Sequence, residues 1–290
     1  MWDVSESTVK RWADAGMLKC FKTIGGHRKF DFSEIVEFQN RSGAALKGSV
    51  PRCDPAEKAA EVEELLAHGD IKALAACYQK AALCGQNSFA SFLLNRARQR
   101  GLTLARIGDE IVKPAMQEIG EQWRAGKIGV LDEHIAISAT FQAVAGLNSN
   151  STESKPGCRL AVTGCSEGEF HCLASTLIGD MLKAAGWSVI ALGPHTPLFT
   201  FASAIGRFKP DLLCLSITMT EYLERAARDY EALRRAASKH GTRIVVGGRA
   251  MDDEQVRARF RGAHYAATLS DLAEMIETTA DKADRASSAG

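Results

Sequence analysis

Residues 160–171 read LAVTGCSEGEFH, and this segment decides the fold of the C-terminal half of the chain. An apolar strand pattern over 159–163 runs into a glycine-containing loop and then into a helical pattern. Three comparable strand patterns follow, each ahead of a helical segment, at 188–192, 211–217 and 243–246. This alternation predicts an α/β domain with a doubly wound parallel sheet. A short strand near 265–267 and a helix from 270 to about 279 complete the prediction.

Residues 56–148 show helical periodicity without the alternation of a strand. Val62, Leu65 and Leu66 mark one amphipathic helix, and a longer one runs through Ile107, Ile111 and Trp123. Four or five helices with short connections predict a helical bundle. The chain is therefore divided into an N-terminal domain (1–41), a linker (42–55), the bundle (56–148), a second linker (149–157) and the sheet domain (158–290).

The composition is that of an ordinary globular protein. The 290 residues are 46% hydrophobic and 24% charged, and the formal net charge of +1 provides no general attraction to nucleic acid. The eight cysteines include no Cys-x-x-Cys pair, and no apolar run reaches the roughly 18–20 residues that span a bilayer. We expect a cytoplasmic protein with reduced thiols and no membrane association.

Polar residues and glycines collect where the predicted parallel strands end. Open parallel sheets bind their ligands at this carboxyl edge. The residues are Glu169 and His171 after the first strand, Ser216 and Thr218 after the third, and Gly247 and Gly248 after the fourth. A lone Glu-x-His is usually a polar loop of a flavodoxin-like domain, so the combination of all three groups is what indicates a binding site.

A second pattern lies in the bundle, where Trp123 is followed, after nine residues, by Glu133 and His134. An aromatic face can cover the apolar surface of a nucleoside, and a carboxylate can accept hydrogen bonds from ribose hydroxyls. Taken singly, these residues would be a core tryptophan and a solvated helix start.

Together, the two patterns resemble the cobalamin-binding module of the CarH/LitR family of light-responsive, MerR-type transcriptional regulators. The resemblance implies that His171 is the lower axial ligand to cobalt and displaces the cofactor's own dimethylbenzimidazole, with Glu169 holding the other imidazole nitrogen. Ser216 and Thr218 would bind the nucleotide tail, and Gly247 and Gly248 would let the backbone approach it. Trp123, Glu133 and His134 would cover the upper, adenosyl-bearing face, which makes adenosylcobalamin the expected cofactor.

The chain departs from the family pattern at two positions of this module. The motif continues His-x-x-Gly, but Ala174 stands at the glycine position, and we expect its methyl group to crowd the corrin or its tail. Arg124 stands where the family has a histidine that binds cobalt after light has removed the adenosyl group. A charged guanidinium cannot act as that ligand, so we expect a photoproduct without bis-histidine coordination.

Residues 5–38 resemble the winged helix-turn-helix of MerR-type regulators. The resemblance implies a recognition helix that reaches DNA through Thr8, Lys10 and Arg11, and a hairpin wing that contacts the backbone through His27, Arg28 and Lys29. Such domains normally carry another helix ahead of the recognition helix, whereas here the recognition helix lies almost at the first residue. We expect this to remove packing partners of Val9 and Trp12.

We therefore predict an adenosylcobalamin-dependent, light-sensing transcriptional repressor without enzymatic turnover. By analogy with the family, the dark form is a homo-oligomer, a tetramer, bound to operator DNA, and photolysis of the Co–C bond releases it. One alternative is a corrinoid carrier for methyl transfer, which would prefer methylcobalamin. Another is a MerR-type repressor that uses no cofactor or a different chromophore.

Overall fold

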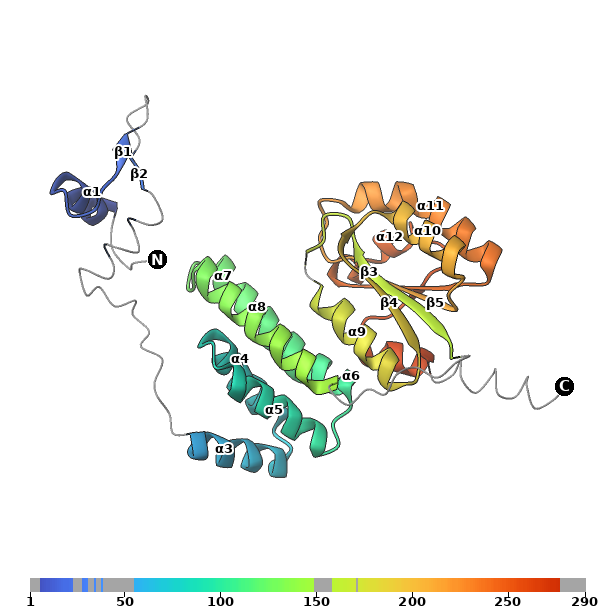
Figure 1. Cartoon of the computed structure of the whole chain (residues 1–290), viewed down its shortest axis with the longest axis horizontal. Helices are drawn as coiled ribbons and strands as arrows, with labels where there is room; N and C mark the ends of the chain where they lie inside the picture. The colour runs from blue at the N-terminus through green and yellow to red at the C-terminus, as the bar shows by residue number, and fades with distance from the viewer. Residues whose placement is uncertain are drawn as a thin grey trace. The chain divides into compact units, whose positions relative to one another are not determined.

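The computed structural model describes residues 6–22, 28–30, 34, 38, 55–148, 158–170 and 172–276. The chain forms two compact units, Met1–Glu57 and Lys58–Gly290 (Figure 1). The bundle and the sheet domain thus share the second unit. The predicted linkers fall outside the described residues, except for Pro55, where a helix begins.

The N-terminal unit contains the predicted helix and hairpin. Helix α1 covers Glu6–Asp14, and strands β1 (Phe21–Lys22) and β2 (Arg28–Lys29) pair in antiparallel fashion. The ring of Trp12 packs on that of Phe38 with centroids 5.0 Å apart, so Trp12 does have a packing partner. His27 of the predicted wing lies outside the described residues.

The helical part of the second unit begins with α3 and ends just before the second predicted linker. Its elements are α3 (Pro55–His68), α4 (Ile71–Leu83), α5 (Asn87–Gln99), α6 (Leu104–Arg106), a π-helix (Ile107–Val112), α7 (Lys113–Arg124), α8 (Val130–Ala145) and a 3₁₀ turn (Gly146–Asn148). Leu74, Tyr78, Leu93 and Ile111 are buried in its core.

The sequence predicted one continuous helix through Ile107 and Trp123, but the structure has a π-helical turn inside it. The Lys113 N–H donates to the carbonyl of Gly108, five residues earlier. Pro114, which follows, has no N–H with which to continue the usual i→i−4 pattern. The inserted turn places Gly108 and Asp109 against the sheet domain.

The sheet domain confirms the predicted doubly wound parallel sheet, with strand order β4-β3-β5-β6-β7. Its elements are β3 (Leu160–Ser166), α9 (Leu173–Ala184), β4 (Ser188–Thr196), α10 (Leu198–Phe208), β5 (Leu212–Ser216), α11 (Leu223–His240), β6 (Arg243–Gly247), a 3₁₀ turn (Arg249–Asp252), α12 (Glu254–Arg257), β7 (His264–Tyr265) and helical residues 269–276. Within the described parts of the chain, no helix is long and apolar enough to cross a membrane.

Strand residues alternate between two apolar cores, one on each face of the sheet. On one face, Val162, Leu213 and Val246 pack against α10 and α11. On the other, Ala161, Leu212 and Val245 pack with Leu182 and Trp187 of the α9 region and with Leu272 and Ile276. Figure 1 shows α9 on one side of the strands and α10 and α11 on the other.

Asp109 of the π-helix joins the bundle to the sheet domain. Its carboxylate accepts hydrogen bonds from the Leu269 N–H at 2.9 Å, from the Ser270 N–H at 2.9 Å and from the Ser270 hydroxyl at 2.8 Å. These bonds satisfy donors at the start of helical residues 269–276, where a carboxylate is also favoured by the helix dipole. Gly108 leaves room for this contact, because a Cβ there would lie 2.3 Å from Leu269 Cδ1.

Candidate functional site

Glu169 ties together two loops at the carboxyl edge of the sheet. It is only 1% exposed, and its Oε2 accepts hydrogen bonds from the backbone N–H groups of Thr218 (2.9 Å) and Met219 (3.0 Å). The loop after β3 is therefore fixed to the loop after β5, as the common sheet edge predicted. His171, the predicted cobalt ligand, lies outside the described residues.

His195 is a residue of this edge that the sequence analysis missed. Its Nδ1 accepts a hydrogen bond from the Gly168 N–H at 2.9 Å, and its own N–H donates to the Glu169 carbonyl at 2.8 Å. The predicted strand stopped at residue 192, whereas β4 continues to Thr196 and so brings His195 beside the β3 loop. The sequence offered one indication of His195, which is its position in the run Gly193-Pro194-His195-Thr196-Pro197 directly after the predicted strand. The two prolines of this run favoured a loop over a longer strand.

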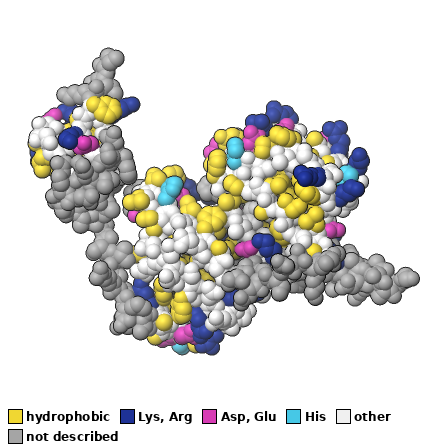
Figure 2. Space-filling view, viewed as in Figure 1, with side chains coloured by type: hydrophobic (Ala, Val, Ile, Leu, Met, Phe, Trp, Pro, Cys, Tyr) yellow, Lys and Arg dark blue, Asp and Glu magenta, His cyan; other side chains and the backbone are white. Residues whose placement is uncertain are grey.

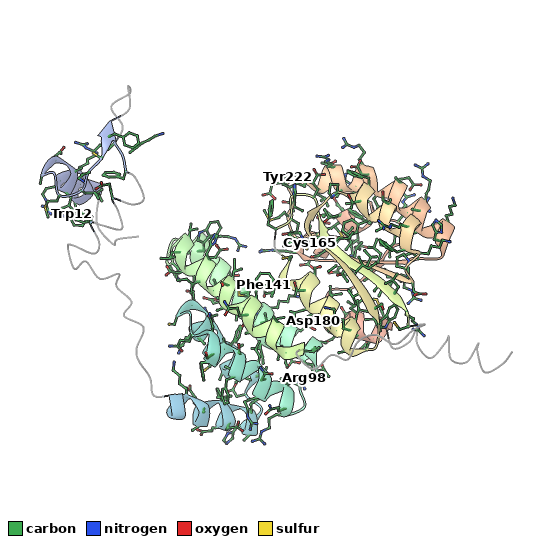
Figure 3. The ribbon with its side chains drawn as sticks, in the orientation of Figure 1. Trp12, Arg98, Phe141, Cys165, Asp180 and Tyr222 are labelled. Atoms are coloured by element: carbon green, nitrogen blue, oxygen red, sulfur yellow. The ribbon has the colours of Figure 1, made fainter. Side chains whose placement is uncertain are left out.

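The face of the sheet beneath α9 changes character towards the carboxyl edge. Cys165, Ser216 and Gly247 are register partners on β3, β5 and β6, and we call them the carboxyl row. Thr163, two residues before Cys165, shares their face, and its Oγ1 is buried without a hydrogen-bond partner among the described residues. Cys165 and Tyr222 are labelled at this end of the sheet in Figure 3.

Small residues of α9 cover this surface. A Cβ on Gly179 would lie 3.8 Å from Thr163 Oγ1, and the Ser175 side chain hydrogen-bonds with Cys165. Burial raises the pKa of the Cys165 thiol to about 12, so it remains a small neutral group. Ala174 was expected to crowd the ligand, but its side chain is on the exposed side of α9, while Ser175 and Gly179 are buried. Ala174 therefore lies outside the buried surface that α9 packs on the carboxyl row, and the crowding of a corrin by its methyl group stays a prediction.

Gly247 and Gly248, at the end of β6, lie so close to neighbouring backbone that a side chain would not fit at either position. Gly248 has a φ of 100°, and a Cβ there would lie 2.4 Å from the Ile217 carbonyl oxygen. A Cβ on Gly247 would lie 2.9 Å from the Ala266 carbonyl oxygen. Gly248 thus lets the β6 loop pass the loop after β5, and Gly247 lets β6 pass the residue that follows β7, which is a reason for both glycines besides the predicted approach of a ligand.

Trp123, Glu133 and His134 gather at one end of the α7–α8 hairpin. Trp123 is in the last turn of α7 and is 45% exposed. Glu133 and His134 are near the start of α8, with Oε2 of Glu133 3.8 Å from Nε2 of His134. Val130 and Leu131 are also exposed there, and Figure 2 shows hydrophobic side chains gathered at this end. A tryptophan exposed in this way offers an apolar surface for a ligand. Arg124 is the exposed last residue of α7.

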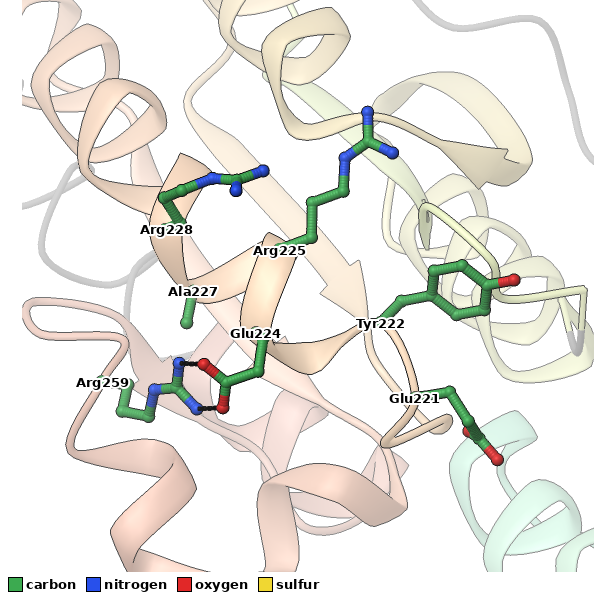
Figure 4. A pocket seen from close by; sticks show the side chains of 7 residues that line it. All are labelled: Glu221, Tyr222, Glu224, Arg225, Ala227, Arg228 and Arg259. Carbon is green, nitrogen blue, oxygen red and sulfur yellow. Dashed lines mark hydrogen bonds and ion pairs between the residues drawn. The ribbon is translucent and has the colours of Figure 1, made fainter.

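A cleft of about 540 Å³ lies at the start of α11, lined by Glu221, Tyr222, Glu224, Arg225, Ala227, Arg228 and Arg259 (Figure 4). Its guanidinium groups are already paired. Arg259 binds both oxygens of Glu224, and Arg225 lies 2.9 Å from Glu167. The cleft is therefore a poor site for an anionic ligand.

In the N-terminal unit, Lys10, Arg11 and Lys29 are exposed, and Thr8 is half-buried. The Arg28 Nη2 lies 2.5 Å from Asp14 Oδ1 at the end of α1. This ion pair joins the hairpin to the helix, and the DNA contact of Arg28 stays a prediction.

Comparison with known proteins identifies the ligand class. A model of a B12 binding domain matches residues 159–273, a second B12 binding domain model matches 59–147, and a helix-turn-helix domain model matches 1–43. The chain carries B12-binding domains. Its cofactor is thus of the cobalt-containing B12 type, and a helix-turn-helix match precedes the domains that bind it.

Corrinoid proteins are the relatives that support this assignment. The chain is 27% identical over 136 residues to trimethylamine corrinoid protein 1 of Methanosarcina mazei and 27% identical over 135 residues to the dimethylamine corrinoid protein of Methanosarcina barkeri. Each match spans 46% of this chain and 63% of the relative. The fold is that of the Methanosarcina barkeri monomethylamine corrinoid protein, with a TM-score of 0.58, 19% identity, and coverage of 69% of this chain and 94% of that one.

The described residues fit a corrinoid. The nucleotide tail of cobalamin is long, and it carries phosphate, ribose and base groups that need hydrogen-bond partners. The unpartnered Thr163 hydroxyl is available as a donor, and the small side chains of the carboxyl row keep large apolar groups off the same face of the sheet.

Proposed function

We propose that this protein is a cobalamin-dependent transcriptional regulator, in which the state of the cofactor's upper ligand controls DNA binding. The observation that carries the proposal is the helix-turn-helix match over residues 1–43, with its exposed Lys10 and Arg11, ahead of the two B12-binding domains. The structural match covers 94% of the monomethylamine corrinoid protein but only 69% of this chain. The remaining part of this chain is therefore available for another role.

In this proposal His171 is the lower ligand of cobalt, and Thr163, Ser216 and Thr218 hydrogen-bond the nucleotide tail. Glu169 holds the β3 and β5 loops together so that both can contact the cofactor. When bound, adenosylcobalamin supplies a Co–C bond that visible light can break.

The bundle residues Trp123, Glu133 and His134 select the adenosyl form. The exposed face of Trp123 would lose contact with water when a nucleoside covers it, and Glu133 would accept ribose hydroxyls. Methyl as an upper ligand would leave this surface exposed. Loss of the adenosyl group then alters the bundle, the dark homo-oligomer dissociates, and the operator DNA is released. Since Arg124 cannot bind cobalt, the proposed photoproduct has no second imidazole ligand from that position.

A corrinoid methyl carrier is the second candidate, and for the B12-binding part taken alone the comparisons favour it. The two relatives named above are methylamine corrinoid proteins, and a solved structure with the same fold is one as well. This function gives no role to residues 1–43 and predicts a preference for methylcobalamin over adenosylcobalamin.

The deciding experiment is size-exclusion chromatography with visible absorbance, on protein loaded in the dark with adenosylcobalamin or methylcobalamin. A parallel gel-shift assay uses DNA from the region upstream of the protein's own gene. The regulator predicts a preference for adenosylcobalamin, an oligomer that becomes smaller after green illumination, and DNA binding that is lost in light. Preference for methylcobalamin, with no DNA binding in either condition, would establish the carrier.

A further inference from the structure

Phe170 and His195 form an exposed aromatic pair at the carboxyl edge of the sheet. Phe170 is 68% exposed, and its ring stacks on that of His195 with centroids 5.1 Å apart and an interplanar angle of 7°. His195 is also exposed. Phe170 directly precedes His171, the predicted cobalt ligand. A large apolar ring exposed beside a binding edge is an apolar surface that a ligand can cover.

The pair is held in place by the loop that carries Glu169. Two hydrogen bonds, Gly168 N–H to His195 Nδ1 and His195 N–H to the Glu169 carbonyl, fix both the ring and the backbone of His195. Among the described residues, His195 and Lys209 are the non-glycine residues with positive φ, and His195 has a φ of 50°. Such backbone strain persists only where surrounding contacts impose it, and it is concentrated at functional sites.

The hydrogen bond at Nδ1 determines what His195 can do. Since Nδ1 accepts a hydrogen bond from the Gly168 N–H, the neutral ring carries its own proton on Nε2. Nε2 is therefore a hydrogen-bond donor and has no lone pair with which to bind a metal. His195 is thus suited to donate to a ligand's carbonyl group, whereas cobalt ligation falls to another residue.

We propose that Phe170 and His195 form a second contact for the corrinoid. Phe170 packs on an apolar edge of the corrin ring, and the His195 Nε2–H donates to the carbonyl oxygen of one of the ring's amide side chains. This inference rests on the B12-binding function of the chain. It assigns a binding role to the loop that ends β4, in addition to the loops after β3, β5 and β6.

The test compares the affinities of full-length variants for hydroxocobalamin, measured by equilibrium dialysis with absorbance detection. His195→Asn keeps an oxygen that can accept from Gly168 and tolerates positive φ, but it removes the Nε2 donor, and we expect about a tenfold loss of affinity. His195→Gln restores a donor at the reach of Nε2 and should bind more tightly than His195→Asn. Phe170→Ala should also lose about tenfold, whereas Phe208→Ala, at the far end of α10 and 40% exposed, serves as the control.

The visible spectrum provides a second readout. The inference predicts that His195→Asn, once saturated, keeps the cobalt spectrum of the unmodified protein, because His195 does not bind the metal. A spectrum without the imidazole ligand in His195→Asn would overturn the assigned tautomer. Equal affinities for Phe170→Ala, His195→Asn and the unmodified protein would overturn the second contact and leave B12 binding intact. Absence of binding by the unmodified protein would overturn both.

Discussion

The two halves of the sheet face beneath α9 differ in side-chain size, although they belong to the same strands. Towards the amino ends, Ala161 and Leu212 are packed by Trp187, Leu272 and Ile276. Towards the carboxyl ends, the carboxyl row and the unpartnered Thr163 face Ser175 and Gly179. The amino half stabilises the fold by burial of large apolar groups, whereas the carboxyl half leaves hydrogen-bonding capacity unused. One face can therefore hold the domain together and also accept a ligand.

The largest expected effect comes from filling the carboxyl half. Ser216→Leu places a bulky apolar group in the carboxyl row, and we expect cobalamin affinity to fall at least about a hundredfold, because the tail loses both space and a hydroxyl. Equilibrium dialysis measures this change. Ser203→Leu, the same substitution on the exposed side of α10, is the matched control and should bind normally. Normal binding by Ser216→Leu would remove the carboxyl row from the site.

Asp109 supports the amino half, since it caps the helical residues that contribute Leu272 and Ile276. Asp109→Ala leaves three donors without their carboxylate, and we expect the free energy of unfolding to fall by about 2 kcal/mol. Urea denaturation measures this loss. The affinity for cobalamin should change less than threefold in the folded protein. A large loss of affinity without a loss of stability would contradict the division between the two halves.

Thr163→Val separates stability from binding at the boundary between the halves. The unpartnered hydroxyl is buried at a cost, so its replacement should raise the free energy of unfolding of the apo protein by about 1 kcal/mol. The same change should weaken cobalamin binding about fivefold, because a donor to the tail is lost. Thermal unfolding measures the change in stability, and equilibrium dialysis on the same samples measures the change in cobalamin affinity. Unchanged or tighter cobalamin binding by Thr163→Val would show that the hydroxyl has no role in ligand binding.

The smallest effect is expected far from the sheet, at Glu63 of α3. Its ion pairs with Arg96 and Arg100 lower the pKa of the carboxyl from 4.5 to about 2. A depressed folded-state pKa stabilises the protein above the unfolded value, and that contribution is lost as the pH falls from about 4.5 towards 2. Glu63→Gln should therefore be slightly less stable than the unmodified protein at pH 7, and the difference should disappear at low pH. The measurement is the urea midpoint of both proteins across this range, and cobalamin binding at pH 7 should not change.

The periodicity of apolar residues was sufficient to predict the layers of the fold. The apolar strand runs and the 3.6-residue patterns predicted the parallel sheet and the bundle, because burial requires those spacings. The common carboxyl edge of the parallel strands also predicted that Glu169 and the β5 loop lie together, and the structure confirms this. The π-helical turn at 107–112 was missed, because the apolar spacing on either side of it remains compatible with one helix.

The positions of individual side chains at the site required the structure. Arg28 matches the wing pattern, and only the structure shows that it also pairs with Asp14 of α1. Ala174 follows the His motif, yet the phase of α9 turns it away from the buried surface. His195 lies in a proline-flanked run that favoured a loop, and only the extension of β4 brings it to Gly168.

The sequence by itself determined the order of the domains, the parallel sheet and the class of ligand, since these depend on local periodicity and on motifs that stay contiguous in the chain. The tertiary structure alone decided which face carries the unpartnered hydroxyl of Thr163, which tautomer His195 adopts and why Gly248 must be glycine. These properties depend on contacts between residues far apart in the chain, and their distances are set only when the layers pack.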